Sequence, residues 1–264
     1  MAKKIISFFF ISILLGHFSA FGKSFSFSDF KTVPIQHGGR IKPLDTFSRE
    51  VVQTVTGKTT FMELSSIDII FSWMILPKMW AERDFIEISS PALKEYLKLK
   101  KDKKYFSPIE ILRLQNLIIL LDQVHQKKNH DEKLSVLDSA AERLEMQLTV
   151  MEKVSSGALV TLIPNPFQWD QSWFSVEKLL SLEGLFASVA DVHSEVVSKA
   201  EDMRMTVLGL FESYRASDEK TFALTSKRLK QVLKEFSAPG YPFVSSLSQE
   251  VFYNEFRPFR VAWI

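Results

Sequence analysis

Residues 134–151 read LSVLDSAAERLEMQLTVM, and this stretch decides the fold class. Its apolar side chains recur at alternating intervals of three and four residues, at Leu134, Leu137, Ala141, Leu144, Leu148 and Met151. This spacing places them on one face of an α-helix for about two and a half heptads. We therefore expect a long amphipathic helix whose apolar face packs against the rest of the protein.

A partner helix is expected just upstream of this stretch. The residues SPIE, 107–110, offer a capping serine, a proline at the first helical position and a glutamate two residues further on. They predict a helix that continues to about Gln126. The polar segment KKNHDEK, 127–133, then separates the two helices. Together they predict a long antiparallel helical hairpin.

The remaining chain is also mostly helical by pattern and capping. Further helices are expected at about 46–56 with Asp45 as N-cap, 66–76 capped by Ser65 or Ser66, 91–99 capped by Ser90, 183–216, 218–236 and 246–256. Short strands are expected within 32–36, 84–88 and 158–164. We thus predict a mainly α protein: one irregular helical domain over 23–264 with that hairpin and a few short strands.

The N-terminus has the form of a secretory signal peptide, residues 1–22. Lys3 and Lys4 precede an apolar run, IISFFFISILL, and Ala20-Phe21-Gly22 fits a cleavage site. The run would rise only about 16 Å as a helix, against a bilayer core of about 30 Å. We therefore expect cleavage and export to the periplasm, with the inner membrane nearby. The alternative is an uncleaved membrane anchor, for which the apolar segment would have to continue through GHFSAFG, residues 16–22.

Charge and cysteine content exclude several classes of protein. The chain has 33 basic and 31 acidic residues, and removal of Lys3 and Lys4 leaves equal numbers. A neutral chain lacks the basic footprint of a nucleic-acid-binding protein. The lysine-rich segment 94–104 is interpreted as a solvated helix end and loop, with contact to anionic lipid as the alternative. The absence of cysteine excludes disulfides, thiolate metal sites and covalent haem attachment through C-x-x-C-H.

Catalytic and metal-binding motifs are missing from the sequence. There is no G-x-S-x-G, P-loop or H-E-x-x-H pattern. His125 and His130 are five residues apart, off the spacing that places two ligands on one helical face. We expect no catalytic residue, no metal site and no cofactor bound by this chain.

The segment HGGRIKPLDTFSRE, residues 37–50, is the strongest candidate for a functional site. Gly38 and Gly39 permit positive φ and expose backbone amides, while Arg40 and Lys42 add cations. Pro43 fixes the chain direction before the expected helix.

Three interpretations of this segment remain open on spacing alone. It is a tight turn whose Arg40 pairs with an acid inside the domain, a loop that docks on a partner, or an anion site formed by amides beside a helix N-terminus.

Two parts of the sequence resemble a known family. VPIQHGGRIKPLDTFSREVVQTVTGK, residues 33–58, resembles the start of an exported segment that precedes the membrane helices in some CcsA/ResC-type (System II) cytochrome c biogenesis proteins. The pattern E-x-x-Y-N-x-x-x-P-F resembles the end of that segment and is formed by Glu250, Tyr253, Asn254, Pro258 and Phe259. The family's haem chemistry belongs to its membrane half, with a tryptophan-rich loop and flanking histidines. Residues 168–173, QWDQSW, do not match that loop, so no haem ligand is carried over.

The resemblance implies a non-enzymatic periplasmic accessory subunit for cytochrome c maturation. It would dock on a CcsA/ResC-like integral membrane protein, which handles the haem, with apocytochrome c as a further partner. The expected contact residues are Gly38, Gly39, Arg40, Lys42, Pro43, Asp45, Thr46, Tyr253, Asn254, Pro258 and Phe259. The alternative is a helical envelope adaptor or scaffold unrelated to haem, and a soluble binder of a small anion is a third.

Overall fold

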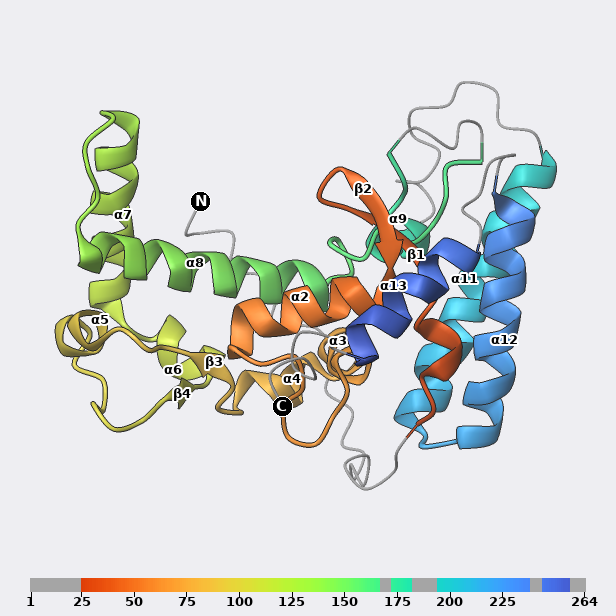
Figure 1. Cartoon of the computed structure of the whole chain (residues 1–264), viewed down its shortest axis with the longest axis horizontal. Helices are drawn as coiled ribbons and strands as arrows, with labels where there is room; N and C mark the ends of the chain where they lie inside the picture. The colour runs from red at the N-terminus through yellow and green to blue at the C-terminus, as the bar shows by residue number, and fades with distance from the viewer. Residues whose placement is uncertain (1–24, 167–171, 182–193, 238–243, 257–264) are drawn as a thin grey trace. The chain divides into compact units, whose positions relative to one another are not determined.

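The computed structural model describes residues 25–166, 172–181, 194–237 and 244–256 (Figure 1). This part of the chain is mainly helical and carries two antiparallel sheets of two strands each, which confirms the predicted fold class. Within it, no helix combines the length and the apolar character needed to cross a membrane.

The chain divides into two compact units, which we describe separately. Ala81–Met146 belongs to unit 1, whereas Ser24–Trp80 and Gln147–Ile264 belong to unit 2, as far as each range is described. Unit 1 is therefore inserted into the chain of unit 2. The single domain over 23–264 stays a prediction, and the expected signal peptide lies outside the described residues.

Unit 1 follows the local signals of the sequence closely. Its elements are β3 (Ile86–Glu87), α5 (Pro91–Tyr96), β4 (Tyr105–Phe106), α6 (Pro108–Leu112), α7 (Gln115–Asn129) and the first half of α8 (Val136–Ser155). Ser90 and Ser107 cap α5 and α6, because each hydroxyl accepts the backbone N–H three residues on. The strand expected within 84–88 is β3, which pairs with β4.

The helix expected from 107 to about 126 is broken. It ends at Leu112, and α7 begins at Gln115 after Leu114 adopts an extended conformation. Ile111 and Leu117 are both buried. In an unbroken helix, residues six apart would lie about 120° apart around the axis, so the two side chains would point in different directions. The break allows both to be buried.

The long antiparallel hairpin lies elsewhere than expected. Figure 1 shows α8 crossing α7 instead of running along it, and the two helices are joined by ion pairs such as Lys127–Asp138. The helices that pack side by side in opposite directions are α11 (Ser194–Arg215) and α12 (Glu219–Phe236), in unit 2. Asp218 caps α12 as predicted, by accepting the N–H of Thr221.

The apolar face of α8 is interrupted by two buried polar residues, Asp138 and Gln147. Ala141, Leu144 and Met151 are buried as expected, but the helix begins after Leu134. In unit 2, Gln147 donates its side-chain amide to the carbonyls of Thr54 and Val55, at 3.1 and 3.2 Å. These carbonyls belong to the last turn of a helix and would otherwise lack partners.

Asp138 should make unit 1 more stable at neutral than at acid pH. The hydrogen bond from Lys127, and then those from the hydroxyl and amide of Ser135, lower its pKa to about 2. Because its pKa is higher in the unfolded chain, this stabilisation is complete above about pH 4 and is lost as the pH falls toward 2. We expect Asp138→Asn to cost about 1–2 kcal/mol at pH 7 and less at pH 3, measured by urea unfolding. The exposed Asp122→Asn is the control, and an equal cost at both pH values would contradict a role for the charge.

Part of the lysine-rich segment of unit 1 pairs with nearby acids. Lys103 pairs with Asp84 and Glu110, and Lys104 pairs with Glu87. Contact between this segment and anionic lipid stays a prediction.

Unit 2 holds the candidate site. Its elements are η2 (Ser28–Phe30), β1 (Pro34–His37), β2 (Arg40–Pro43), α2 (Leu44–Thr56), α3 (Ser66–Ile75), α4 (Pro77–Ala81), the second half of α8, α9 (Val176–Ser181), α11, α12 and α13 (Val244–Phe256). Ser65 caps α3 and Gly57 ends α2, as expected. In place of the strand expected within 158–164 there is one isolated bridge, between Ile163 and Phe174.

The core of unit 2 contains a cluster of aromatic rings centred on Phe222 of α12. Phe25 and Phe27 from the start of the described chain lie 4.7 and 5.3 Å from it between ring centroids. Phe71 of α3 and Tyr214 of α11 complete the cluster. We call residues 25–33 the lead-in. The cluster attaches the lead-in to the antiparallel helices α11 and α12, and the lead-in continues directly into β1.

Candidate functional site

The glycine pair forms the turn of a β-hairpin. β1 and β2 pair antiparallel, with His37 opposite Arg40, and Gly38 and Gly39 connect them. Their φ angles are +62° and +78°, as in the two-residue turns that suit the twist of a hairpin. A Cβ added to either glycine would meet no described atom within 4 Å. The glycines are therefore required by the backbone conformation, and the tip of the hairpin is open.

The helix after the hairpin begins without a side-chain cap, which corrects the prediction for Asp45. α2 starts at Leu44, so Pro43 occupies the N-cap position and Asp45 lies in the first turn. The amides of Leu44 and Asp45 donate instead to the carbonyls of Val33 and Lys31, at 2.7 and 3.2 Å. Because the lead-in supplies these acceptors, no side chain is needed as a cap.

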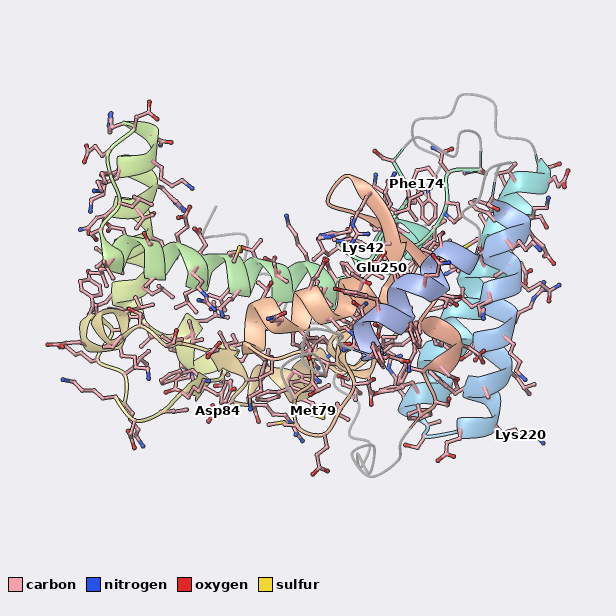
Figure 2. All side chains as sticks on the ribbon, in the orientation of Figure 1. Lys42, Met79, Asp84, Phe174, Lys220 and Glu250 are labelled. Atoms are coloured by element: carbon pink, nitrogen blue, oxygen red, sulfur yellow. The ribbon has the colours of Figure 1, made fainter. Side chains whose placement is uncertain are left out.

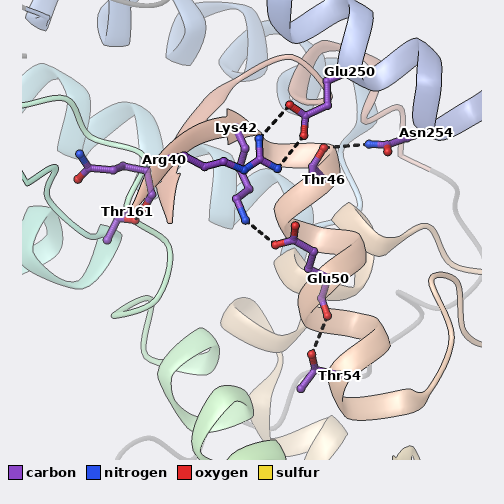
Figure 3. Close-up of polar contacts among 9 residues, drawn as sticks. Arg40, Lys42, Thr46, Glu50, Thr54, Thr161, Glu250 and Asn254 are labelled. Carbon is purple, nitrogen blue, oxygen red and sulfur yellow. Dashed lines mark hydrogen bonds and ion pairs between the residues drawn. The ribbon is translucent and has the colours of Figure 1, made fainter. Parts of the chain in front are cut away.

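Arg40 joins the hairpin to the C-terminal helix α13 (Figure 3). Its two terminal nitrogens donate to both carboxylate oxygens of Glu250, each at 3.1 Å, across 210 residues of sequence. Partial burial acts to raise the pKa of Glu250, but hydrogen bonds from Arg40 and Thr46 and the charges of Arg40 and Lys42 outweigh it, so the pKa is lowered. This bidentate geometry fixes the relative orientation of the two side chains in addition to pairing their charges.

Asn254 makes the second connection between α13 and the N-terminal segment. Its side-chain amide donates to the hydroxyl of Thr46 at 2.9 Å and to the carboxylate of Asp45 at 3.3 Å. Asp45 also accepts from Arg49, one turn further along α2, at 2.7 Å. The carboxylate expected to cap the helix thus binds side chains from two helices.

Lys42 is buried and pairs with Glu50 of α2, with 2.5 Å between Nζ and Oε2. Figure 2 labels Lys42 and Glu250 near the junction of hairpin and α13. The neighbouring His37 ring lies edge-on to Phe47, and its Nδ1 is buried without a hydrogen-bond partner. Burial, and then the charge of Lys42, lower the pKa of His37 despite the opposing charge of Glu50. These surroundings therefore favour the neutral form of His37.

The other edge of β1 is covered by the segment after α8. Gln36 donates its backbone N–H to the carbonyl of Thr161 at 3.1 Å, and its carbonyl accepts the Thr161 hydroxyl. The side-chain oxygen of Gln36 accepts the N–H of Trp173 at 2.8 Å. The hairpin is therefore held from both sides, and only its tip projects.

We call the group Arg40, Lys42, Asp45, Thr46, Arg49, Glu50, Glu250 and Asn254 the polar junction. It includes five of the eleven expected contact residues, four from the first segment and Asn254 from the second. Tyr253 lies on α13 but is half exposed, and Pro258 and Phe259 lie outside the described residues. Partner contact by any of these residues stays a prediction.

The arrangement does not favour an anion site. Arg40 and Lys42 already pair with Glu250 and Glu50, and the first amides of α2 already have acceptors. The interpretation in which Arg40 pairs with an acid of its own domain describes this geometry best.

The expectation that this chain binds neither a metal ion nor a haem group stays a prediction. No group of three or more potential ligands among histidine, aspartate and glutamate could hold a metal ion in the part of the chain that the structure describes. A cavity among Leu44, Ile70, Val207 and Leu229 is apolar and has room for about one water molecule, so a haem does not fit it.

Glu50, Arg49 and Lys31 were missed by the sequence analysis. Lys31 pairs with Glu255 of α13 at 2.6 Å, beside the polar junction. Asp45 and Arg49 stand four apart, a spacing that predicts a helical ion pair and could have been found. The partners on α13 carry no such local signal.

Comparison with known proteins gives one distant relative. No family model matches the chain. The chain is similar to protein NrfI of Wolinella succinogenes, with 23% identity over 154 residues, or 55% of this chain. The match spans 16% of the length of NrfI, so the chain corresponds to a small part of that protein.

Proposed function

We propose that this chain is a non-enzymatic periplasmic accessory subunit for cytochrome c maturation. In this proposal it docks on a haem-handling membrane protein of the CcsA/ResC type, and haem stays with that partner. Apocytochrome c is a further candidate for contact. The similarity to NrfI supports the broader part of the proposal, a role in cytochrome c maturation.

The observation that carries the finer proposal is the bond between the two segments that resemble the family. Arg40 lies in the first segment and Glu250 in the second, and they form a two-pronged ion pair. Asn254 and Thr46 repeat the connection one turn away. The two segments that resemble the same family thus contact each other in the folded chain. This is expected if the family and this chain fold these segments in the same way.

The ion pairs of the polar junction are better suited to holding the fold together than to catalysis. Each cation has an acid of its own within 3.1 Å. The hydrogen bonds between Arg40 and Glu250 raise the pKa of Arg40 and help to lower the pKa of Glu250, so this pair stays charged at neutral pH. A general acid or base needs a pKa near the working pH instead. This supports the non-enzymatic part of the proposal.

The surface left for a partner is the hairpin tip with the exposed side of α13. Gly38, Gly39 and half of the Arg40 side chain are exposed, as is half of Tyr253. In the proposal, the polar junction fixes the position of the hairpin tip relative to α13, and the partner contacts both at the same time.

The test is a deletion strain complemented with variants, followed by haem staining of denatured envelope proteins. We expect deletion to remove covalently haem-bearing bands and the unaltered gene to restore them. Arg40→Glu and Glu250→Arg should each fail to restore most of the signal, because each places like charges together. The double exchange should recover part of it, because it restores an opposite pair.

The matched control is Arg204→Glu in α11, which breaks a similar two-pronged pair with Glu201 away from the hairpin. It should restore haem staining fully. Unchanged bands after deletion would refute the proposal and favour the alternative of an envelope adaptor unrelated to haem. Far-UV circular dichroism of each purified variant checks that the fold is kept.

A further inference from the structure

His37 lies at the end of β1, next to the turn of the hairpin, and one nitrogen of its ring has no partner. The ring lies edge-on to Phe47, with the two ring centroids 5.1 Å apart, and its Nδ1 is buried without a hydrogen bond. Most buried polar atoms in proteins have a partner, so an exception on a titratable ring needs an explanation.

The unpartnered nitrogen determines how the ring responds to a proton. In the neutral ring the single proton belongs on Nε2, because a proton on Nδ1 would be a buried donor without an acceptor. The second proton, which makes the ring an imidazolium, then has to go to Nδ1. Protonation of His37 therefore creates a charge and a buried, unsatisfied N–H group in one step, and both are unfavourable.

The charges that act on the ring come from β2 and α2. Lys42 of β2 is buried and pairs with Glu50 of α2. Burial of the ring, and then the charge of Lys42, lower the pKa of His37, whereas the charge of Glu50 opposes this. A second cation beside Lys42 is therefore disfavoured more than the acid favours it.

The other charges around the hairpin are already paired. Within the polar junction they form two further pairs, Arg40 with Glu250 and Asp45 with Arg49. The segments 160–166 and 172–174, which supply the contacts to the other edge of β1, contain no charged residue. Glu50 is therefore the acid to which a charged His37 ring would turn.

A protonated ring has two responses, and both weaken the polar junction. Glu50 can turn its carboxylate to the imidazolium, which leaves the buried Lys42 without its acid. Alternatively the ring leaves Phe47 for solvent, which detaches the end of β1 from α2. His37 stands opposite Arg40 and Lys42 is two residues from it on β2, so either change disturbs the bond from Arg40 to α13.

We propose that His37 is a pH-sensitive switch whose protonation weakens the hold of the hairpin on α13. A histidine with a lower pKa in the folded than in the unfolded chain binds its proton more readily when unfolded. Its contribution to stability is therefore complete well above pH 6.5, the approximate pKa of an unfolded histidine, and is lost as the pH falls below that value. This inference stands apart from the proposed function, because the purified chain alone tests it.

The test is hydrogen–deuterium exchange of the purified protein, followed by mass spectrometry at about pH 7.5 and about pH 5, on either side of the ordinary histidine pKa. Dividing each rate by the intrinsic chemical rate at the same pH gives protection factors that can be compared. We expect peptides that cover β1, β2 and α13 to lose protection at the lower pH. The peptide from α13 reports its release, because a detached helix of 13 residues is only marginally stable.

Two variants separate His37 from the other groups that titrate in this range. His37→Phe keeps a ring beside Phe47 that takes up no proton, and His37→Gln replaces it as the neutral variant if the phenylalanine does not fold. We expect the protection of either variant to be the same at both pH values. The matched control is His125→Phe, which removes an exposed histidine paired with Glu145 in unit 1 and should leave the pH response intact.

The pKa of His37 itself is measured by NMR, from the imidazole signals that are missing in the His37 variant. We expect a value below about 6.5, and a higher value would overturn the proposal. Equal protection of the unaltered protein at both pH values, or an equal loss in the His37 variant, would also overturn it. A loss confined to the hairpin, with α13 still protected, would show that the two do not separate and would count against the switch.

Discussion

Replacing Phe222 with alanine is expected to lower the free energy of unfolding by about 3–5 kcal/mol. The side chain is 1% exposed and its ring contacts rings from the lead-in, α3 and α11. Removing it leaves a cavity that these rigid rings cannot close. Such a loss is a large share of the total stability of a domain, which is about 5–15 kcal/mol.

The measurement is urea unfolding followed by circular dichroism, with Leu224→Ala as the control. Leu224 is on the same helix but 61% exposed, so its loss should cost less than about 0.5 kcal/mol. Limited proteolysis should cut the Phe222→Ala variant first in the lead-in, which has lost its main contact. A cost below about 1 kcal/mol would mean that the cluster does not hold the lead-in.

Replacing Tyr214 with phenylalanine is expected to cost about 2–3 kcal/mol at pH 7. The Tyr214 hydroxyl donates to Asp68 at 2.8 Å, and both side chains are buried. Burial raises the pKa of Asp68 and the hydrogen bond from Tyr214 opposes this rise. Without the hydroxyl, the carboxyl group of Asp68 remains buried and has lost the donor that favours its charged form.

The same pair predicts an unusual pH dependence. The pKa of Asp68 is higher in the folded than in the unfolded chain, so its contribution to stability falls as the pH rises above its unfolded pKa of about 3.8. The cost of Tyr214→Phe should therefore be smaller at pH 4 than at pH 7. Asp68→Asn should cost less than Tyr214→Phe at pH 7, because it removes the buried charge. Unfolding curves at both pH values measure this, and the reverse order of the two variants would contradict it.

Local features of the fold could be predicted because their causes are local. Ser65, Ser90, Ser107 and Asp218 cap helices as expected, since each needs only an amide three residues away. Asp45 fits the same pattern and the prediction was wrong, because carbonyls of the lead-in already bind the first amides of α2. Hydrogen-bond acceptors that come from another segment cannot be recognised in the sequence around the helix start.

The sequence predicted many of the residues of the candidate site but not which residues of the two segments contact each other. The segment 37–50 and the residues of α13 were selected separately, and an acid within the domain was one expected partner for Arg40. That this acid is Glu250 depends on packing between segments 210 residues apart. The hairpin itself was available from the sequence, because two glycines between short extended runs favour a tight turn. Lys42 and Pro43 obscured the second strand, since charge and proline are uncommon there.

The distance along the chain between Arg40 and Glu250 affects the order in which the protein can be made. At about 5–20 residues per second, the ribosome completes the hairpin some 10–40 s before it reaches α13. During that interval Arg40 and Thr46 have no α13 to bind. The contact must also close a very long loop, and the conformational entropy lost on closing it slows folding. The N-terminal hairpin of unit 2 therefore gains its contacts with α13 only after the C-terminal helix has been synthesised.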